Sequence, residues 1–153
     1  MTPSTTRQRG IAAIELAILL PLIIILATSV IFIARVLMSY SIAHKAAQSA
    51  AVYLATVPMS DMMDTSRKTA AQTIAGAVAD ITLAEVKPGG REPIVVDVHC
   101  DGLTCAGPTP PKEISVTVRM WMMDDFFFSQ TGGIIPDGGL PLTVVVTIPY
   151  LGA

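Results

Sequence analysis

The chain has 153 residues, enough for one modest domain, and apolar residues make up 52% of it while charged residues make up only 14%. Soluble chains carry about 25% charged residues on average, and disorder needs low hydrophobicity with high charge, so this composition excludes a disordered chain. A formal net charge of −2, with no basic run longer than Arg67-Lys68, argues against a surface that binds nucleic-acid phosphates.

The segment from residue 11 to residue 34 is apolar except for Glu15, and it follows a polar stretch that contains Arg7 and Arg9. As a helix these residues extend roughly 36 Å, which is enough to cross a hydrocarbon core of about 30 Å. A domain of this size has no means of burying such a helix on all sides. We therefore expect a single membrane span, with the two arginines on the cytoplasmic side and the C-terminal part on the opposite side.

Three hypotheses for this segment differ in what happens to its N-terminal flank. A secretory signal that is removed has an apolar stretch of about 7–15 residues and then a small-residue cleavage site, which this segment does not resemble. An uncleaved anchor is the second hypothesis. The third is cleavage between Gly10 and Ile11, which leaves the helix in the mature protein.

Glu15 favours the third hypothesis. An ionisable side chain in the middle of a span costs about 2.5–3.5 kcal/mol, and a bare anchor has no use for one. After cleavage, the new α-amine of Ile11 would lie one helical turn from the Glu15 carboxylate and would be largely protonated at neutral pH. The carboxylate would also complement the positive end of the helix dipole. The alternative is that Glu15 snorkels to the membrane interface.

The stretch from Arg9 to Pro21 resembles the N-terminal signature of TadE/TadF-like minor pseudopilins of the tight adherence (Tad) pilus, a branch of the type IV pilin superfamily. Gly10, Glu15 and Pro21 lie at the spacing of that family. The resemblance implies cleavage after Gly10 by a prepilin peptidase and a role for Glu15 in subunit assembly. Its implied partners are that peptidase, other minor pseudopilins, the major pilin and inner-membrane lipid.

The expected organisation is a cleaved leader over residues 1–10, a transmembrane and pilin-like helix over 11–57, and an extracytoplasmic α+β domain over 58–153. Leu16 stands where family members often have an aromatic residue, so TadE-like and TadF-like chains are not distinguished. The implied function is pilus assembly for adherence, without enzymatic activity. The alternatives are an uncleaved single-span protein with a periplasmic binding or structural domain, and a secretion-system pseudopilin.

The apolar run ends at Arg35, but no Gly or Pro follows until Pro58, so we expect one continuous helix from about Ile11 to Ala55. Its second half carries apolar residues at spacings of three or four, expected to lie against the chain's own domain or a partner helix. These residues are Met38, Ile42, Ala46, Ala50, Tyr53 and Val57.

Pro58 and the polar residues after it predict a turn, and either Asp64 or Thr65 is expected to cap a second helix that runs to about Leu83. The apolar face expected for this second helix consists of Ala70, Ile74, Ala77, Val78 and Ile81. The sequence Lys87-Pro88-Gly89-Gly90 is expected to end the helical part.

The remainder predicts strands. Apolar residues alternate with other residues over 94–99 and over 114–122, and the β-branched run 142–148 is typical of a buried strand. Pro and Gly clusters at 107–111 and 132–141 separate the runs. The sequence therefore predicts an α+β fold: a long N-terminal helix, a second helix, and a small, mainly antiparallel sheet of three or four strands packed on the helices.

Cys100 and Cys105 flank the expected tip between two strands. A disulfide there would close a short loop, contribute roughly 2 kcal/mol, and need the oxidising compartment that the expected topology supplies. The competing hypothesis is a metal site of His99 with both cysteines, but it has no fourth ligand in view. We expect neither a metal nor a cofactor.

No phosphate-binding Gly-rich loop and no metalloprotease or serine-hydrolase motif occurs, so no catalytic residue is predicted. The oddest local sequence is Asp124-Asp125 followed by Phe126–Phe128. We interpret it as a solvated acidic turn followed by core aromatics. A subunit contact and a calcium site are the alternatives, although two adjacent carboxylates do not supply the six or more oxygens that Ca²⁺ takes.

Overall fold

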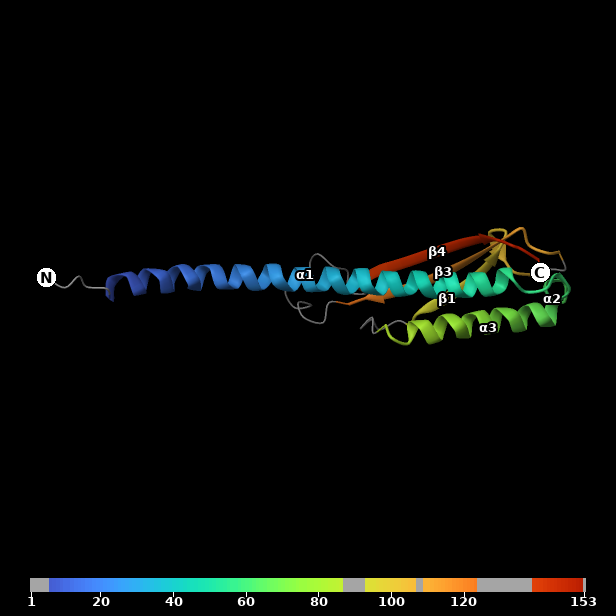
Figure 1. Ribbon diagram of the computed structural model, residues 1–153, viewed down its shortest axis with the longest axis horizontal. Coiled ribbons are helices and arrows are strands. Elements are labelled where there is room, and N and C mark those ends of the chain that lie inside the picture. Colours follow the sequence, from blue (N-terminus) through green and yellow to red (C-terminus); the bar gives the residue numbers. More distant parts are fainter. Residues whose placement is uncertain (1–5, 87–92, 107–108, 124–138, 153) are drawn as a thin grey trace. The chain divides into compact units, whose positions relative to one another are not determined.

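The computed structural model describes residues 6–86, 93–106, 109–123 and 139–152, and the chain divides into two compact units, Met1–Val36 and Leu37–Ala153. The described elements are three helices and a four-stranded antiparallel sheet, which confirms the predicted α+β fold (Figure 1). The expected Lys87–Gly90 terminator, the first part of the 107–111 cluster, most of the 132–141 cluster and the Asp124–Phe128 sequence lie outside the described residues.

Helix α1, Thr6–Ala55, is continuous through Pro21 and ends where the sequence predicts. It begins five residues earlier than expected, because a single Gly such as Gly10 costs a helix only about 1 kcal/mol and does not end it. In the first unit its Ile, Leu and Val side chains from Ile14 to Ile33 are 49% to 69% exposed, and Phe32 has an intermediate exposure. Most of the apolar surface of this unit is therefore exposed.

The second part of α1, from residue 37 onward, buries a stripe of small residues in the second unit. Ala43, Ala46, Ala47 and Ala50 are completely buried, and the stripe continues to Leu54 and Ala55. The predicted apolar stripe is correct at Ala46, Ala50 and Val57 but wrong at Met38, which is 67% exposed. All six alanines from Ala43 to Ala55 are buried, so small residues, and not the larger apolar ones, identify the side of this helix that packs.

A short helix, α2 (Met59–Met63), occupies the stretch where only a turn was expected. Helix α3 (Thr65–Leu83) follows, with the boundaries that the sequence predicts. Asp64 caps α3, since its Oδ1 accepts hydrogen bonds from the backbone N–H groups of Ser66 at 2.8 Å and Arg67 at 3.1 Å. This satisfies two of the free donors at a helix start.

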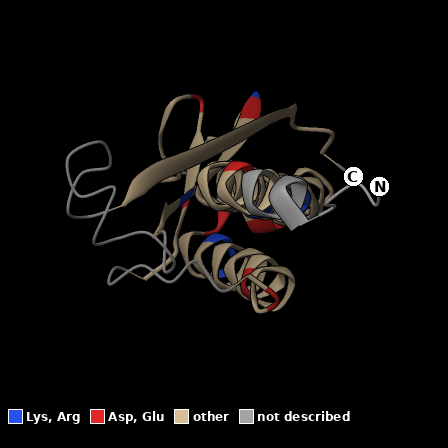
Figure 2. Cartoon of the chain, turned by 90° about the vertical axis from the view of Figure 1, so that its left-hand side faces the viewer, with Lys and Arg blue, Asp and Glu red and all other residues tan. Residues whose placement is uncertain are grey.

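The face of α3 that is buried is not the one predicted. Ala71, Ala75 and Ala79 are buried, whereas Ile74 is 47% and Ile81 is 75% exposed. Helix α3 and the second part of α1 lie side by side (Figures 1 and 2). Alanines on both helices allow their backbones to approach closely, while isoleucines at the contact would hold the helices apart. Close helix packing therefore overrides the hydrophobic stripe.

The strands pair in the order β2-β1-β3-β4, and every pair is antiparallel. Their bounds are Val95–Cys100 for β1, Leu103–Thr104 for β2, Glu113–Met122 for β3 and Leu140–Pro149 for β4. Strand β3 confirms the predicted period of two, since five alternate side chains are at most 2% exposed: Ile114, Val116, Val118, Met120 and Met122. These side chains form the centre of the core.

Strand β4 corrects the prediction of a fully buried strand. Among the described strands it is an edge strand that pairs only with β3, and Val144 is buried while Val145 is 57% exposed. Gly139 precedes it with a φ of +90°, and a Cβ there would lie 2.6 Å from the carbonyl oxygen of Met122. Only glycine fits this entry into the strand.

The variant Ala75→Leu tests which face of α3 is buried. We expect it to lower the free energy of unfolding by about 1–3 kcal/mol, because three extra carbons must enter a close-packed interior. Ile74→Ala, on the exposed face, is the matched control and is expected to cost less than about 1 kcal/mol. Thermal unfolding in detergent, followed by far-UV circular dichroism, measures both. A larger loss for Ile74→Ala would show that the face predicted from the sequence is the packed one.

Candidate functional site

The first candidate site lies near the start of α1, where Gly10, Ile11 and Glu15 occupy about one and a half turns of helix. The backbone of all three residues is helical, and the Glu15 side chain is exposed. No hydrogen bond or ion pair joins Glu15 to another side chain within the described part of the chain.

The other polar side chains of the apolar segment bond to their own helix. The Thr28 hydroxyl donates to the carbonyl oxygens of Ile24 at 2.8 Å and Ile25 at 2.9 Å, and the Ser29 hydroxyl donates to Ile25 at 2.8 Å. Hydrocarbon chains of lipid offer no hydrogen-bonding partners, so polar side chains in a membrane-spanning helix need bonds of this kind. Glu15 makes no such bond within the described part of the chain.

The second candidate site is the hairpin that joins β1 and β2. Asp101 and Gly102 form its tip, with φ of 52° and 78°, and this pair of positive φ angles is typical of the two-residue type I′ turn. A disulfide joins Cys100 to Cys105, so neither sulfur is available to a metal, which rules out the hypothesis that added His99 as a third ligand. Among the described residues, no three His, Cys, Asp or Glu side chains are grouped to hold an ion.

The hairpin is tied to its surroundings on two sides. The Asp101 carboxylate accepts hydrogen bonds from the backbone N–H groups of Lys112 at 2.9 Å and Glu113 at 3.0 Å, at the start of β3. The Gln72 side chain of α3 donates to the carbonyl oxygen of Cys105 at 3.2 Å. The disulfide-closed loop therefore connects the start of β3 to α3 through hydrogen bonds.

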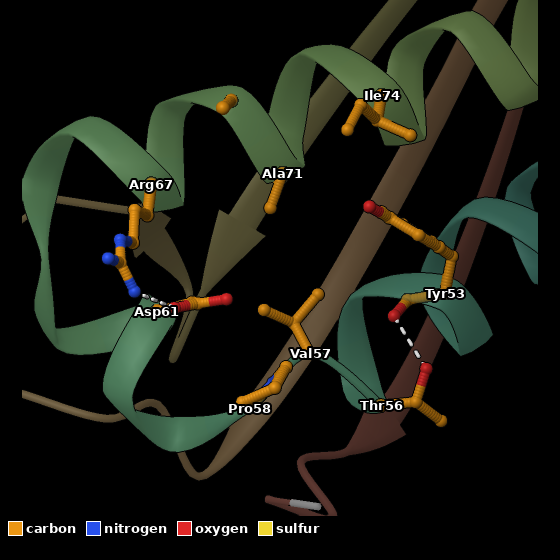
Figure 3. A pocket seen from close by; sticks show the side chains of 9 residues that line it. Tyr53, Thr56, Val57, Pro58, Asp61, Arg67, Ala71 and Ile74 are labelled. Carbon is orange, nitrogen blue, oxygen red and sulfur yellow. Dashed lines mark hydrogen bonds and ion pairs between the residues drawn. The ribbon is translucent and has the colours of Figure 1, made fainter.

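A groove of about 340 Å³ lies between the end of α1, α2 and the start of α3 (Figure 3). Its walls are mostly apolar, and Arg67 and Asp61 form an ion pair of 2.8 Å at one end. The Asp61 carboxylate, by its hydrogen bond and its charge, raises the pKa of Arg67 above its ordinary value, and Asp64 adds to this. The lining residues are Tyr53, Thr56, Val57, Pro58, Asp61, Arg67, Ala70, Ala71 and Ile74.

The sequence analysis missed this groove because packing of α3 on α1 creates it from residues that are far apart in the chain. Asp61 was seen only as part of a turn, and Tyr53 only as part of a stripe. Among the side chains that line the groove, no nucleophile is paired with a base.

The C-terminal residues fasten the end of α1. The Tyr150 hydroxyl donates to the carbonyl oxygen of Val57 at 2.7 Å, and the N–H of Leu151 donates to the carbonyl oxygen of Ala55 at 3.2 Å. These carbonyls lie at the helix end, where intrahelical donors run out. Burial, and then the charge of Asp61, raise the pKa of Tyr150 above its ordinary value of 10.0.

Tyr150→Phe is expected to lower the free energy of unfolding by about 0.5–1.5 kcal/mol at pH 7, because the Val57 carbonyl loses its donor. A tyrosine pKa that is raised by folding contributes stability below the unfolded pKa of about 10, and this contribution disappears as pH rises through the folded pKa. The variant should therefore lose less stability than the natural chain between pH 7 and pH 11. Thermal unfolding at the two pH values measures this, and equal losses would contradict a role for the Tyr150 proton.

Comparison with known families bears on the first candidate site. Residues 10–52 match the family model described as TadE-like protein. The match covers less than a third of the chain and contains Gly10, Ile11, Glu15 and most of α1. Searches of curated proteins and of solved structures gave no match to the chain. One described helix is long and apolar enough to cross a membrane, and together with the match it indicates single-pass membrane anchoring.

Proposed function

We propose, from the TadE-like match over residues 10–52, that the chain is a minor pseudopilin that supports assembly of a Tad pilus. TadE-like pilus proteins are structural and not enzymes. In this proposal a prepilin peptidase removes residues 1–10, and the mature helix joins other minor pseudopilins and the major pilin. The observation that carries the proposal is Glu15, a lone carboxylate on an apolar helix, to which no hydrogen bond or ion pair is made within the described part of the chain.

Cleavage after Gly10 would create the donors that Glu15 lacks. In the uncut helix, the N–H groups near Glu15 are used by the helix itself, because α1 starts at Thr6. A chain that starts at Ile11 has three backbone N–H groups without intrahelical acceptors, those of residues 12–14, together with a charged α-amine. A Glu15 carboxylate, of the same or a neighbouring subunit, is a matching acceptor for that end.

The polar contact is needed because apolar contact alone does not direct assembly in lipid. Lipid tails are as apolar as leucine, so a helix gains little hydrophobic free energy by leaving lipid for another helix. The apolar surface of α1 therefore holds the subunit in the membrane until assembly. A contact between Glu15 and an N-terminus would then set the axial position of each helix against the next.

The second unit supports placement in the periplasm. The Cys100–Cys105 disulfide belongs to an oxidising compartment, and Arg7 and Arg9 favour a cytoplasmic N-terminus. Residues beyond the span would then lie outside the inner membrane, where a pilus is assembled.

Intact-mass measurement and N-terminal sequencing of the chain purified from its native membrane test the proposal. We expect the mature chain to begin at Ile11 in cells that have the prepilin peptidase and at Met1 in cells that lack it. A chain that begins at Met1 in both would contradict the proposal and favour an uncleaved anchor with a periplasmic binding or structural domain.

A further inference from the structure

Lys68 of α3 is buried beside the disulfide. It is only 4% exposed, although a lysine is almost never fully buried in a protein unless it is paired. It lines a cavity of about 140 Å³, and the other described residues that line this cavity all lie between Cys100 and Pro111. Both cysteines of the disulfide are among them. Lys68 therefore faces the disulfide-closed loop and the described residues that lead from it to β3.

The arm, which we define as residues 103–106, has few attachments besides the disulfide. Leu103 is 73% exposed, and Cys105 is the one arm residue that is not exposed, so burial of apolar surface does little to hold the arm. Its strand β2 pairs with β1 at two residue pairs, and a hairpin this short is marginally stable on its own. The Gln72 side chain holds the Cys105 carbonyl by one hydrogen bond. The disulfide is the covalent attachment that keeps the arm over Lys68.

The tip of the hairpin has attachments of its own. The Asp101 N–H donates to the carbonyl oxygen of Glu113 at 3.0 Å, and the Asp101 carboxylate accepts from the N–H groups of Lys112 and Glu113. These bonds join the tip to the start of β3 and involve neither cysteine. Breaking the disulfide would therefore release the arm, which follows the tip in the chain, and leave the tip in place.

We propose that the Cys100–Cys105 disulfide is a redox latch. While the disulfide is closed, the arm covers Lys68. Once the disulfide is reduced, the arm leaves α3 and the Lys68 amine becomes exposed to water, while the sheet stays folded. Taking an amine out of water costs free energy even where the amine has a partner, so the burial of Lys68 favours the open arm as soon as the covalent link is lost. The latch lies within the second unit and is independent of the proposed pilus function.

The reductant in this proposal is a dithiol of the thiol–disulfide oxidoreductase class. One thiolate of the dithiol attacks a sulfur of the Cys100–Cys105 bond, so that a mixed disulfide forms and the other cysteine leaves as a thiolate and takes up a proton. The second thiolate of the dithiol then attacks the mixed disulfide, and the remaining cysteine leaves and is protonated in turn. The chain gains two electrons and two protons, and the dithiol is oxidised to a disulfide. Both cysteines are half-buried and the four residues between them are exposed, so a dithiol can reach the bond.

The exposure of Lys68 is measured by acylation of its amine. The full chain in detergent, either oxidised or kept reduced with dithiothreitol, is treated briefly with acetic anhydride, and the modified lysines are quantified by mass spectrometry. The rate at Lys68 is divided by the rates at Lys45 and Lys112, which are exposed in the closed form. We expect reduction to raise this relative rate by about tenfold or more, because a link that closes a short loop favours the closed form by at least that factor.

Two variants and a second measurement serve as controls. The double variant Cys100→Ser with Cys105→Ser should show the raised rate without a reductant and should not respond to dithiothreitol. Gln72→Ala loses the hydrogen bond to the arm but keeps the disulfide, so we expect it to raise the rate by less than about threefold. Hydrogen exchange of the amides in the centre of β3 should change by less than about twofold on reduction, because opening is local.

Each of three results would overturn the proposal. Equal relative rates at Lys68 in the oxidised and reduced chains would show that the arm does not depend on the disulfide. A raised rate together with faster exchange throughout β3 would show that the disulfide stabilises the whole fold and is not a local latch. A rise in Gln72→Ala as large as that on reduction would show that the hydrogen bond, and not the disulfide, keeps Lys68 covered.

Discussion

Glu15→Ala is expected to leave removal of the leader intact and to reduce pilus assembly by roughly tenfold to a hundredfold. The variant removes a carboxylate whose partner, in the proposed function, is the N-terminus of a mature helix. A hydrogen bond to a charged group contributes about 1.5–3 kcal/mol, and each 1.4 kcal/mol is a factor of ten in an equilibrium. The effect falls on assembly alone because the cut lies between Gly10 and Ile11, a full helical turn away.

Two further variants separate charge from shape at this site. Glu15→Gln keeps the size and one acceptor oxygen but loses the charge, so we expect an assembly defect smaller than that of Glu15→Ala. Leu16→Ala removes a neighbouring apolar side chain that is 59% exposed, and it should assemble almost normally. Electron microscopy and quantification of sheared pili measure assembly, and the mass of the purified chain measures processing. Normal piliation of Glu15→Ala cells would show that the carboxylate has no directing role.

Features that depend on neighbouring residues in the sequence could be predicted. The end of α1 at Ala55, the Asp64 cap of α3 and the alternation in β3 follow from breakers, capping and period, each set within a few residues. The Asp101-Gly102 tip between Cys100 and Cys105 is similarly local. Glu15 is singled out as a lone acid in an apolar span, and Gly10 by its place before that span and by the resemblance; the roles of both residues stay predictions.

Features that depend on tertiary pairing were missed or predicted wrongly. The buried face of α3 is set by the alanines of α1, which a reading of α3 alone does not take into account. Val145 is exposed because β4 lies at the edge of the described sheet. A run of β-branched residues predicts a strand but does not predict the position of that strand in the sheet. The groove that contains Tyr53 and Arg67 exists only because two helices pack together.

Gly10→Leu is expected to abolish processing, so that the chain accumulates with residues 1–10 attached. The proposed peptidase has to bring its catalytic groups to the peptide bond between Gly10 and Ile11. Glycine allows close approach to this bond because it has no Cβ, and it weakens the helix at this point by about 0.5–1 kcal/mol relative to alanine. The α1 backbone is helical here, so local unwinding would have to precede the cut. A leucine side chain opposes both steps.

Gly10→Ala is the control for side-chain size, and it should be processed more slowly but not blocked. Intact mass distinguishes the cut and uncut chains in each variant. The double variant Gly10→Leu with Glu15→Ala links this result to the first prediction. If Glu15 acts only on an N-terminus that cleavage creates, the double variant should assemble no worse than Gly10→Leu alone, since coupled sites are not additive. Full processing of Gly10→Leu would place the cut elsewhere and would remove the reason for pairing Glu15 with Ile11.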